Sequence, residues 1–202
     1  MKQSYRLFSN PRLFQPLLVV ILLLAFAGRL AAGQQFLFQL DPQHTGVNFT
    51  LGDVLHTVHG TFLVKQGSLT LDPASGKLTG EIVVDAKSGN SGSGMRDRKM
   101  HKEVLESERY PEIAFRPDHI DGPVSLQGKS SLQVHGLFSI HGSAHELTVP
   151  TEVDVSSDHW TAKLHFAVPY AKWGMKNPST LFLRVGESVD IDLTAAGIVA
   201  RP

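Results

Sequence analysis

The stretch LTLDPASGKLTGEIVVDA, residues 69–86, decides the fold class. Leu69 and Leu71 alternate with a polar residue, which places both on one face of a strand. Residues 72–77 follow with the Pro and Gly that favour a tight turn, and Leu78 begins a second apolar run. Two such runs joined by a short turn predict an antiparallel β-hairpin.

The same pattern of short alternating runs recurs on both sides of this hairpin. In residues 47–51 the apolar side chains fall on one face, and Val58, Phe62 and Val64 continue a similar alternation. Further strands are expected near residues 112–120, 130–140, 146–155, 160–169 and 188–195. We therefore expect an all-β chain that forms an antiparallel barrel of about eight strands, with a sandwich as the other arrangement that suits this turn spacing.

One segment interrupts the strand pattern and predicts a single inserted helix. Residues 88–94 are rich in Gly and Ser and are expected to form a flexible loop. Residues 95–107 contain helix-forming residues without Gly or Pro, and Ser93 is the expected N-cap. Met100 and Val104 lie four apart on one side, so we expect them to face inward as the helix packs across the barrel or its mouth.

The N-terminal segment has the composition of a secretory signal peptide. Residues 1–12 carry three cations and no acid, and Ala31-Ala32-Gly33 offers small residues for cleavage. The uninterrupted apolar run of residues 17–27 is eleven residues long, fewer than the ~20 that a bilayer span needs. An uncleaved membrane anchor is the alternative. We expect residues 1–33 to be a cleaved signal peptide, residues 34–202 to form one domain, and the mature protein to be periplasmic or secreted.

Charge and cysteine content exclude several classes of protein. The formal net charge of the chain is zero, but four of its basic residues precede Gln34, so the remainder has 15 basic and 19 acidic residues and a net charge of −4. A mildly acidic body argues against nucleic-acid binding, which requires a basic surface. The absence of cysteine excludes disulfides, thiol nucleophiles and thiolate metal sites.

The sequence motifs do not predict catalysis, a metal or a cofactor. The pairs His56/His59 and His141/His145 have helical spacing, but they lie in expected strands or turns, where residues three apart point to opposite faces. The Gly-x-Ser-x-Gly motif of serine hydrolases does not occur. Carboxylates that could pair for glycoside hydrolysis are expected to lie on solvated faces. We expect a protein that is not an enzyme, with a histidine-based metal- or haem-associated stress protein as the alternative.

Large apolar side chains recur along the expected strands, and they allow two interpretations. The set is Phe49, Phe62, Phe115, Phe138, Phe166 and Trp173. In a barrel of about eight strands, such residues either fill the core or line a cavity for one slender ligand. The first arrangement would suit a structural envelope protein and the second a carrier.

Four stretches of the sequence together carry a family resemblance. They are FQLDPQHTGVNF (38–49), VHGTF (58–62), MRD (95–97) followed by YPEIAF (110–115), and VPYAKWGM (168–175) leading into VDIDL (189–193). With these stretches the chain resembles the YceI-like family of lipocalin-fold, polyisoprenoid-binding exported proteins. Two features depart from the family pattern: Glu103-Val104-Leu105 stands where a Phe-Phe pair is usual, and the Gly/Ser loop replaces a more ordered stretch.

The resemblance implies a lipocalin-like barrel that holds an isoprenoid chain, such as a quinone or polyprenyl lipid, or a fatty amide of similar shape. The headgroup is expected at the mouth beside Arg96, Asp97 and His101. Tyr170 and Trp173 either close the pocket or pack the last turn. The residues expected to contact the ligand are Phe49, Phe62, Arg96, Asp97, Met100, His101, Val104, Tyr110, Phe115, Phe138, Phe166 and Trp173. We expect no cofactor and no nucleic-acid partner, and membrane contact only during lipid exchange. Pairing of two barrels is left open.

Overall fold

The structure, a computed structural model, describes residues 34–52, 57–180 and 184–200. The described residues all belong to one compact unit, Gly33–Pro202. The expected signal peptide, residues 1–33, lies outside the described residues. No helix among the described residues has the length and hydropathy that crossing a bilayer requires.

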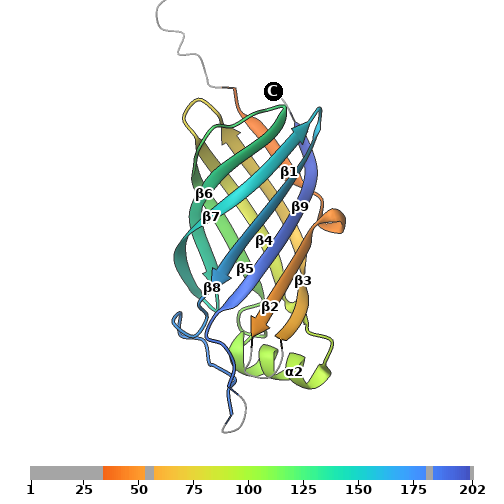
Figure 1. Cartoon of the computed structure of the whole chain (residues 1–202), viewed down its shortest axis with the longest axis vertical. Coiled ribbons are helices and arrows are strands. Elements are labelled where there is room, and N and C mark those ends of the chain that lie inside the picture. The colour runs from red at the N-terminus through yellow and green to blue at the C-terminus, as the bar shows by residue number, and fades with distance from the viewer. Residues whose placement is uncertain (1–33, 53–56, 181–183, 201–202) are drawn as a thin grey trace, which may run out of the picture. The chain divides into compact units, whose positions relative to one another are not determined.

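Within the described residues, nine strands form one closed antiparallel barrel with a short helix at one end (Figure 1). The elements in chain order are β1 (Phe36–Leu40), η2 (Pro42–His44), β2 (Gly46–Gly52), β3 (Thr57–Asp72), β4 (Lys77–Asn90), α2 (Gly94–Lys99), η3 (Met100–Val104), β5 (Glu112–Asp121), β6 (Gly128–Ile140), β7 (Ser143–Ser156), β8 (His159–Val168) and β9 (Val189–Ala200). The strand order is β1-β3-β2-β9-β8-β7-β6-β5-β4, and the pairings β1–β9 and β3–β4 complete the ring. The predicted all-β barrel with one inserted helix is confirmed.

Two of the described strands share one position, so the barrel wall has eight positions. β1 and β2 both pair with β3 on one side and β9 on the other. The turn η2 separates them and stays tied to β9, because Asp41 N donates to Ala196 O (2.8 Å) and Ala196 N donates to Thr45 Oγ1 (3.3 Å). The prediction of about eight strands is therefore confirmed, and every described strand has a neighbour on both sides.

The hairpin of residues 69–86 forms as predicted between β3 and β4. Asp72 pairs with Lys77 across the turn. The Asp72 carboxylate accepts hydrogen bonds from Ser75 Oγ (2.8 Å) and Ala74 N (3.0 Å), and the Ser75 bond makes the largest contribution to lowering the pKa of Asp72. An ionised Asp72 thus stabilises this turn in the way that Asp commonly does at the first turn position.

The prediction of a flexible loop over residues 88–94 is wrong for its first three residues, because β4 continues to Asn90. A β-carbon at Gly89 would lie 2.6 Å from the Phe62 ring and 2.7 Å from the Met100 methyl group. Gly89 is therefore required by the close approach of two side chains and not by a turn.

The predicted helix is present, but it ends earlier than expected. It begins at Gly94 as α2 and continues as the π-helical turn η3 to Val104, whereas the sequence suggested an end at Ser107. Leu105 N donates to Met100 O (2.8 Å) and so closes the wider turn. Ser93 occupies the N-cap position, as predicted, although its side chain makes no capping hydrogen bond. We call this end of the barrel the helix end, and the opposite end, at the β3–β4 turn, the far end (Figure 1).

Buried apolar residues form two clusters, one toward each end of the barrel. The far-end cluster includes Phe36, Phe38, Leu40, Leu71, Leu78, Ile120, Leu132, Val155, Trp160 and Val199. The helix-end cluster comprises Ala86, Leu105, Ile113, Phe138, Ile140, Val168, Tyr170 and Met175. At the far end the Trp160 ring meets Phe38 edge-on at 5.8 Å, and Trp160 Nε1 donates to Ile198 O (3.2 Å). Packed aromatic rings thus occupy the far end of the interior.

Candidate functional site

The interior of the barrel contains a cavity of about 400 Å³. Side chains from all nine described strands line it, together with residues of the helical segment and of the connection between β8 and β9. Small-molecule binding sites typically enclose roughly 300–1,000 Å³. The alternative interpretation, a core filled by the protein's own side chains, is therefore wrong.

The alternation along each strand decides which side chains face the cavity. On β8 every second residue lines it, namely Trp160, Ala162, Leu164, Phe166 and Val168. On β9 the lining residues are Val189, Ile191, Leu193 and Ala195. Ala162 and Ala195 lie opposite each other in the β8–β9 register. Two small side chains at paired inward positions leave space in the middle of this wall.

Five phenylalanines that the sequence predicted for the ligand site line the cavity: Phe49, Phe62, Phe115, Phe138 and Phe166. The Phe49 and Phe62 ring centroids lie 5.4 Å apart, and the Phe138 and Phe166 rings meet edge-on at 5.8 Å. Such contacts restrict the orientation of both rings. The phenylalanine rings therefore form an apolar cavity wall with fixed ring orientations.

One face of the helical segment contributes to the cavity at the helix end. It presents Arg96, Lys99, Met100 and Val104, whose spacing of three and four residues brings them to one side. Met100 and Val104 thus face inward, as predicted. Among the described residues of the wall, Arg96 and Lys99 are the charged ones, and both are cations. Lys99 is not among the residues predicted from the sequence, although its spacing of three from Arg96 indicates this face of the helix.

Hydrogen bonds around Ser91 hold the Arg96 side chain at the helix end of the cavity. Arg96 Nε donates to Ser91 Oγ (3.2 Å) and Arg96 Nη2 donates to Ser91 O (2.9 Å). Asp97 Oδ1 accepts from Ser91 N (2.8 Å) and Ser91 Oγ (2.6 Å). Partial burial by itself raises the pKa of Asp97, but the Ser91 hydrogen bonds and the nearby charges of His101 and Arg96 lower it overall. Asp97 is therefore ionised at neutral pH and positions the Arg96 side chain through Ser91.

The second cation is also held in place. Lys99 Nζ donates to Pro178 O (2.8 Å), which belongs to the β8–β9 connection. Lys176 Nζ donates to Glu103 Oε2 (2.6 Å), and this ion pair lowers the pKa of Glu103. Two polar contacts at the helix end thus join the connection between β8 and β9 to the helical segment.

Four residues predicted to contact a ligand lie off the cavity wall: Asp97, His101, Tyr110 and Trp173. His101 Nε2 donates to Gly89 O (2.9 Å) and so faces β4. Trp173 follows the end of β8, where strand alternation no longer applies, and its ring stacks on His145 at 4.0 Å. Contact between these four residues and a ligand stays a prediction.

Two of the described histidines considered as metal ligands, His59 and His141, have separate hydrogen-bond partners, whereas the buried Nε2 of His145 has none. His141 Nε2 lies 3.2 Å from Glu106 Oε1, and the His141 ring packs on Tyr110 at 4.8 Å. His59 forms a hydrogen bond with a threonine hydroxyl of β2 (3.1 Å). His56 lies outside the described residues. The positions of His59, His141 and His145 therefore do not support a metal site for the alternative metal- or haem-associated function.

Solved structures share this fold. BcnA of Burkholderia cenocepacia matches with a TM-score of 0.63 at 18% identity, over 78% of this chain and 99% of that chain. A polyisoprenoid binding domain from Saccharophagus degradans matches with a TM-score of 0.62 at 16% identity, over 82% of this chain and 98% of that chain. The YceI protein of Campylobacter jejuni matches with a TM-score of 0.51 at 12% identity, over 67% of this chain and 80% of that chain. At these identities the likeness establishes the fold alone.

The sequence itself carries the family assignment. No curated protein matches it. The model of the YceI-like domain matches residues 38–196, which is most of the chain and includes seven of the nine described strands in full and parts of β1 and β9. The chain therefore belongs to the YceI-like domain family.

Proposed function

We propose that this protein is an exported carrier that binds one long-chain isoprenoid lipid, such as an isoprenoid quinone, or a similar amphiphile inside its barrel and does no chemistry on it. The observation that carries this proposal is the apolar cavity of about 400 Å³ with two cations at one end. The domain from Saccharophagus degradans is a polyisoprenoid binding domain with the same fold, which supports the lipid class. The composition of residues 1–33 supports export to the periplasm or beyond the cell.

The size of the cavity suits a slender apolar tail. If a methylene group occupies about the volume of a water molecule, about 30 Å³, a cavity of about 400 Å³ holds roughly a dozen carbons. Each buried methylene contributes about 0.8 kcal/mol, or roughly 10 kcal/mol for such a tail. The loss of translational and internal freedom of the lipid offsets part of this free energy. Tail burial thus provides most of the affinity and little of the selectivity.

The two ends of the cavity differ in charge, which sets the orientation of the ligand. Arg96 and Lys99 lie at the helix end, whereas the polar wall residues Ser125 and Ser130 of the far end are uncharged. Ser125 N donates to Ser130 Oγ (2.8 Å), so these two groups partly satisfy each other. Guanidinium and ammonium groups bind phosphate, carboxylate or quinone oxygens. The headgroup therefore belongs at the helix end and the tail toward the far end.

The ionisable groups on the wall favour binding without catalysis. Among the described wall residues these groups are Arg96, Lys99 and Tyr170. The Tyr170 hydroxyl donates to Gly186 O (2.5 Å). Burial, with a further contribution from Glu187, raises the pKa of Tyr170 above its ordinary value. Tyr170 is therefore a neutral phenol that anchors the β8–β9 connection. Among the described residues, the wall has no carboxylate or histidine that could act as a base.

Native mass spectrometry of protein purified without detergent tests this function. We expect a species heavier than the mature chain by the mass of one lipid, because the cavity admits a single slender tail. Extraction with organic solvent should release that lipid and leave the mass of the chain alone. Protein that carries no lipid, and that also fails to bind an isoprenoid quinone added in excess, would contradict the proposal.

Removal of the two cations is expected to separate headgroup binding from tail binding. In an Arg96→Ala/Lys99→Ala variant we expect the affinity for a prenyl phosphate to fall about 100-fold, since each charge-assisted hydrogen bond contributes about a factor of ten. The affinity for the uncharged prenyl alcohol of the same length should stay within about twofold. Intrinsic fluorescence measures both titrations, because Trp160 lines the cavity.

The matched control for this pair is Arg98→Ala. Arg98 lies on the same helix, is exposed and does not line the cavity. It should leave both affinities unchanged. An equal loss for phosphate and alcohol, or a loss in the Arg98 variant as large as in the double variant, would show that the headgroup lies elsewhere.

A further inference from the structure

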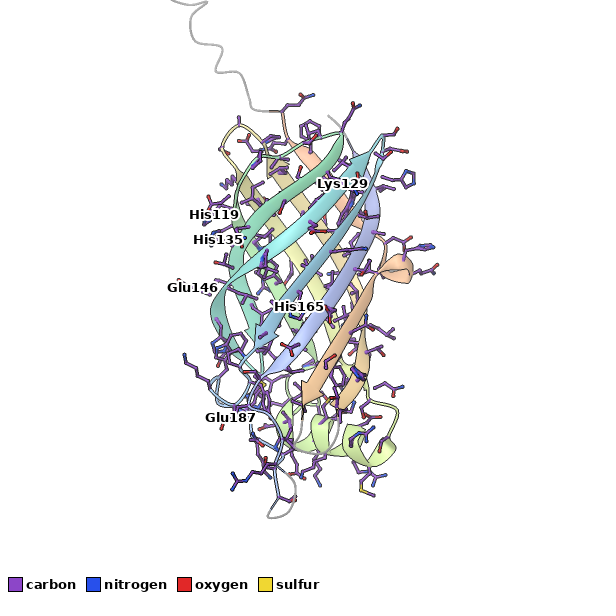
Figure 2. All side chains as sticks on the ribbon, in the orientation of Figure 1. His119, Lys129, His135, Glu146, His165 and Glu187 are labelled. Carbon is purple, nitrogen blue, oxygen red and sulfur yellow. The ribbon has the colours of Figure 1, made fainter. Side chains whose placement is uncertain are left out.

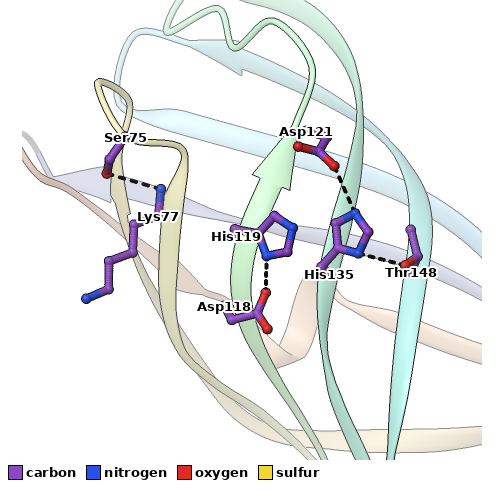
Figure 3. Close-up of polar contacts among 7 residues, drawn as sticks. All are labelled: Ser75, Lys77, Asp118, His119, Asp121, His135 and Thr148. Atoms are coloured by element: carbon purple, nitrogen blue, oxygen red, sulfur yellow. Dashed lines mark hydrogen bonds and ion pairs between the residues drawn. The ribbon is translucent and has the colours of Figure 1, made fainter.

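Three side chains with metal-ligating atoms lie together on the outer wall of the barrel, away from the cavity. They are His119, Asp121 and His135, and one ligand atom from each lies within 4.8 Å of the others. Among the described residues, no other group of three His, Asp or Glu side chains brings its ligand atoms this close together. Figure 2 shows His119 and His135 at the outside of the barrel, and Figure 3 shows the three side chains from β5 and β6 close together.

The register of β5 and β6 brings these side chains to one face. His119 pairs directly with His135, and Asp121 lies two residues after His119 on the same side of β5. The register shifts between Pro117 and His119, which makes Asp118 the extra residue of a β-bulge. Asp118 and His119 are consequently both exposed although they are adjacent in sequence. Bulges of this kind redirect side chains and often lie beside functional sites.

Each histidine also has a partner for its other ring nitrogen. Asp118 Oδ1 bonds to His119 Nδ1, and Thr148 Oγ1 lies 2.7 Å from His135 Nδ1 (Figure 3). When the Nδ1 of a histidine donates to a carboxylate or hydroxyl, its Nε2 presents a lone pair, and this arrangement is typical around metal-bound histidines. Asp121 Oδ2 accepts a hydrogen bond from His135 Nε2 (3.0 Å), so two of the three ligand atoms already converge. A metal ion would replace the proton on Nε2, and His135 Nδ1 would then donate to Thr148 Oγ1.

Binding of a metal ion would require only a small movement, which is a turn of the His119 ring. The two imidazole rings stack at 4.2 Å with an interplanar angle of 7°, so the His119 ring must turn to aim its lone pair at the space beside Asp121. The His119 side chain is 49% exposed, so it has room to turn out of the stack, whereas His135 is 29% exposed and more firmly held. Ligand atoms around a tetrahedral zinc ion lie roughly 3.3 Å apart, so ligand atoms that lie within 4.8 Å of one another need to approach by at most about 1.5 Å.

The local charge favours a cation at this place. Asp118 and Asp121 contribute two carboxylates, and the facing strands add Thr148 on β7 and Lys77, which pairs with His119 from β4. In Figure 3 the Lys77 side chain extends away from the two rings. The two carboxylates outweigh this one cation.

We propose that His119, Asp121 and His135 form a binding site for one divalent transition metal ion of the zinc class. Two imidazole nitrogens and one carboxylate oxygen are ligands that zinc accepts, and a tetrahedral ion would keep its fourth position for water. Such an ion would link β5 to β6 across the bulge. The site lies outside the barrel, so it does not depend on the carrier function.

Isothermal titration of tag-free protein with zinc chloride tests this site. We expect one ion per chain with micromolar affinity, and a loss of at least tenfold in His119→Ala and in His135→Ala. Asp118→Asn should weaken binding by a smaller factor, because Asp118 acts through His119. Cobalt(II) should give the visible absorption of a tetrahedral ion with the unaltered protein and lose it in the histidine variants.

His165→Ala is the matched control. His165 is an exposed histidine of β8 whose Nδ1 lies 2.9 Å from Asp192 Oδ1, so it has a carboxylate partner but no second histidine (Figure 2). It should leave zinc affinity unchanged. The proposal is overturned if the unaltered protein binds no zinc, or if His135→Ala and His165→Ala bind it equally well while both unfold at the temperature of the unaltered protein.

Discussion

An Ala162→Phe/Ala195→Phe double substitution is expected to abolish lipid binding, with a loss of affinity of at least 100-fold. Both alanines are buried, line the cavity and lie opposite each other on β8 and β9. A cavity of about 150 Å³ is large enough for a benzene ring, so two added rings take up most of the 400 Å³ available here. The tail then loses the space that provides most of its binding free energy.

The measurement is the fluorescence titration with an isoprenoid quinone, repeated with native mass spectrometry of the protein as purified. The matched control is Lys163→Phe/Thr194→Phe, because these residues pair on the same two strands but point outward. The control adds the same two rings and should bind lipid normally. Thermal unfolding distinguishes a filled cavity from a misfolded barrel, since apolar side chains added to an empty space need not destabilise the fold.

Retained binding in a folded inward variant would contradict the carrier proposal. The lipid would then have to lie outside the space between β8 and β9, and the cavity would be an incidental feature of the barrel. Loss of binding in both the inward and the outward variants would instead show that the assay reports general damage to this wall.

The alternation of apolar residues was sufficient to predict most of the fold and much of the candidate site. It placed the hairpin of residues 69–86 and the later strands correctly, because each strand has one face toward the interior. The same rule placed Phe49, Phe115 and Phe166 toward the interior, and all three line the cavity. Local pattern works here because nearly the whole wall is regular antiparallel sheet.

Features that depend on contacts between distant residues could not be predicted in this way. Gly89 suggests a loop in the sequence, and only the approach of Phe62 and Met100 explains why glycine stands within a strand. Pro117 is a local signal for the bulge at Asp118, because proline inside a sheet occurs mainly at edges and bulges, but the pairing of His119 with His135 depends on the register between β5 and β6 and could not be predicted. Whether the interior is hollow or filled depends on the summed volumes of all inward side chains. The alternation of apolar residues gives the direction of each side chain but not this sum.

Gly197→Ala is expected to reduce the free energy of unfolding by about 3 kcal/mol, which would lower Tm by roughly 10 °C in a chain of this size. Gly197 lies on β9 between Leu40 of β1 and Trp160 of β8. A β-carbon there would lie 2.0 Å from Gln39 O and 2.8 Å from Trp160 Nε1. The nearest of these atoms belongs to the backbone of β1, which is paired on both sides, so it cannot move without opening the ring.

Gly46→Ala provides the matched control for this prediction, and the comparison isolates the cause of the loss. Gly46 also lies in a strand, β2, which pairs with β9 beside β1, but a β-carbon there meets no atom within 4 Å. Alanine at this position should therefore be neutral or stabilise by up to about 1 kcal/mol, because it restricts the unfolded chain. Thermal and urea unfolding measure both variants. Equal stability of the two would mean that β1 can move away from β9, and a barrel that opens so readily at this seam would give a lipid a second route into the cavity at the end opposite Arg96.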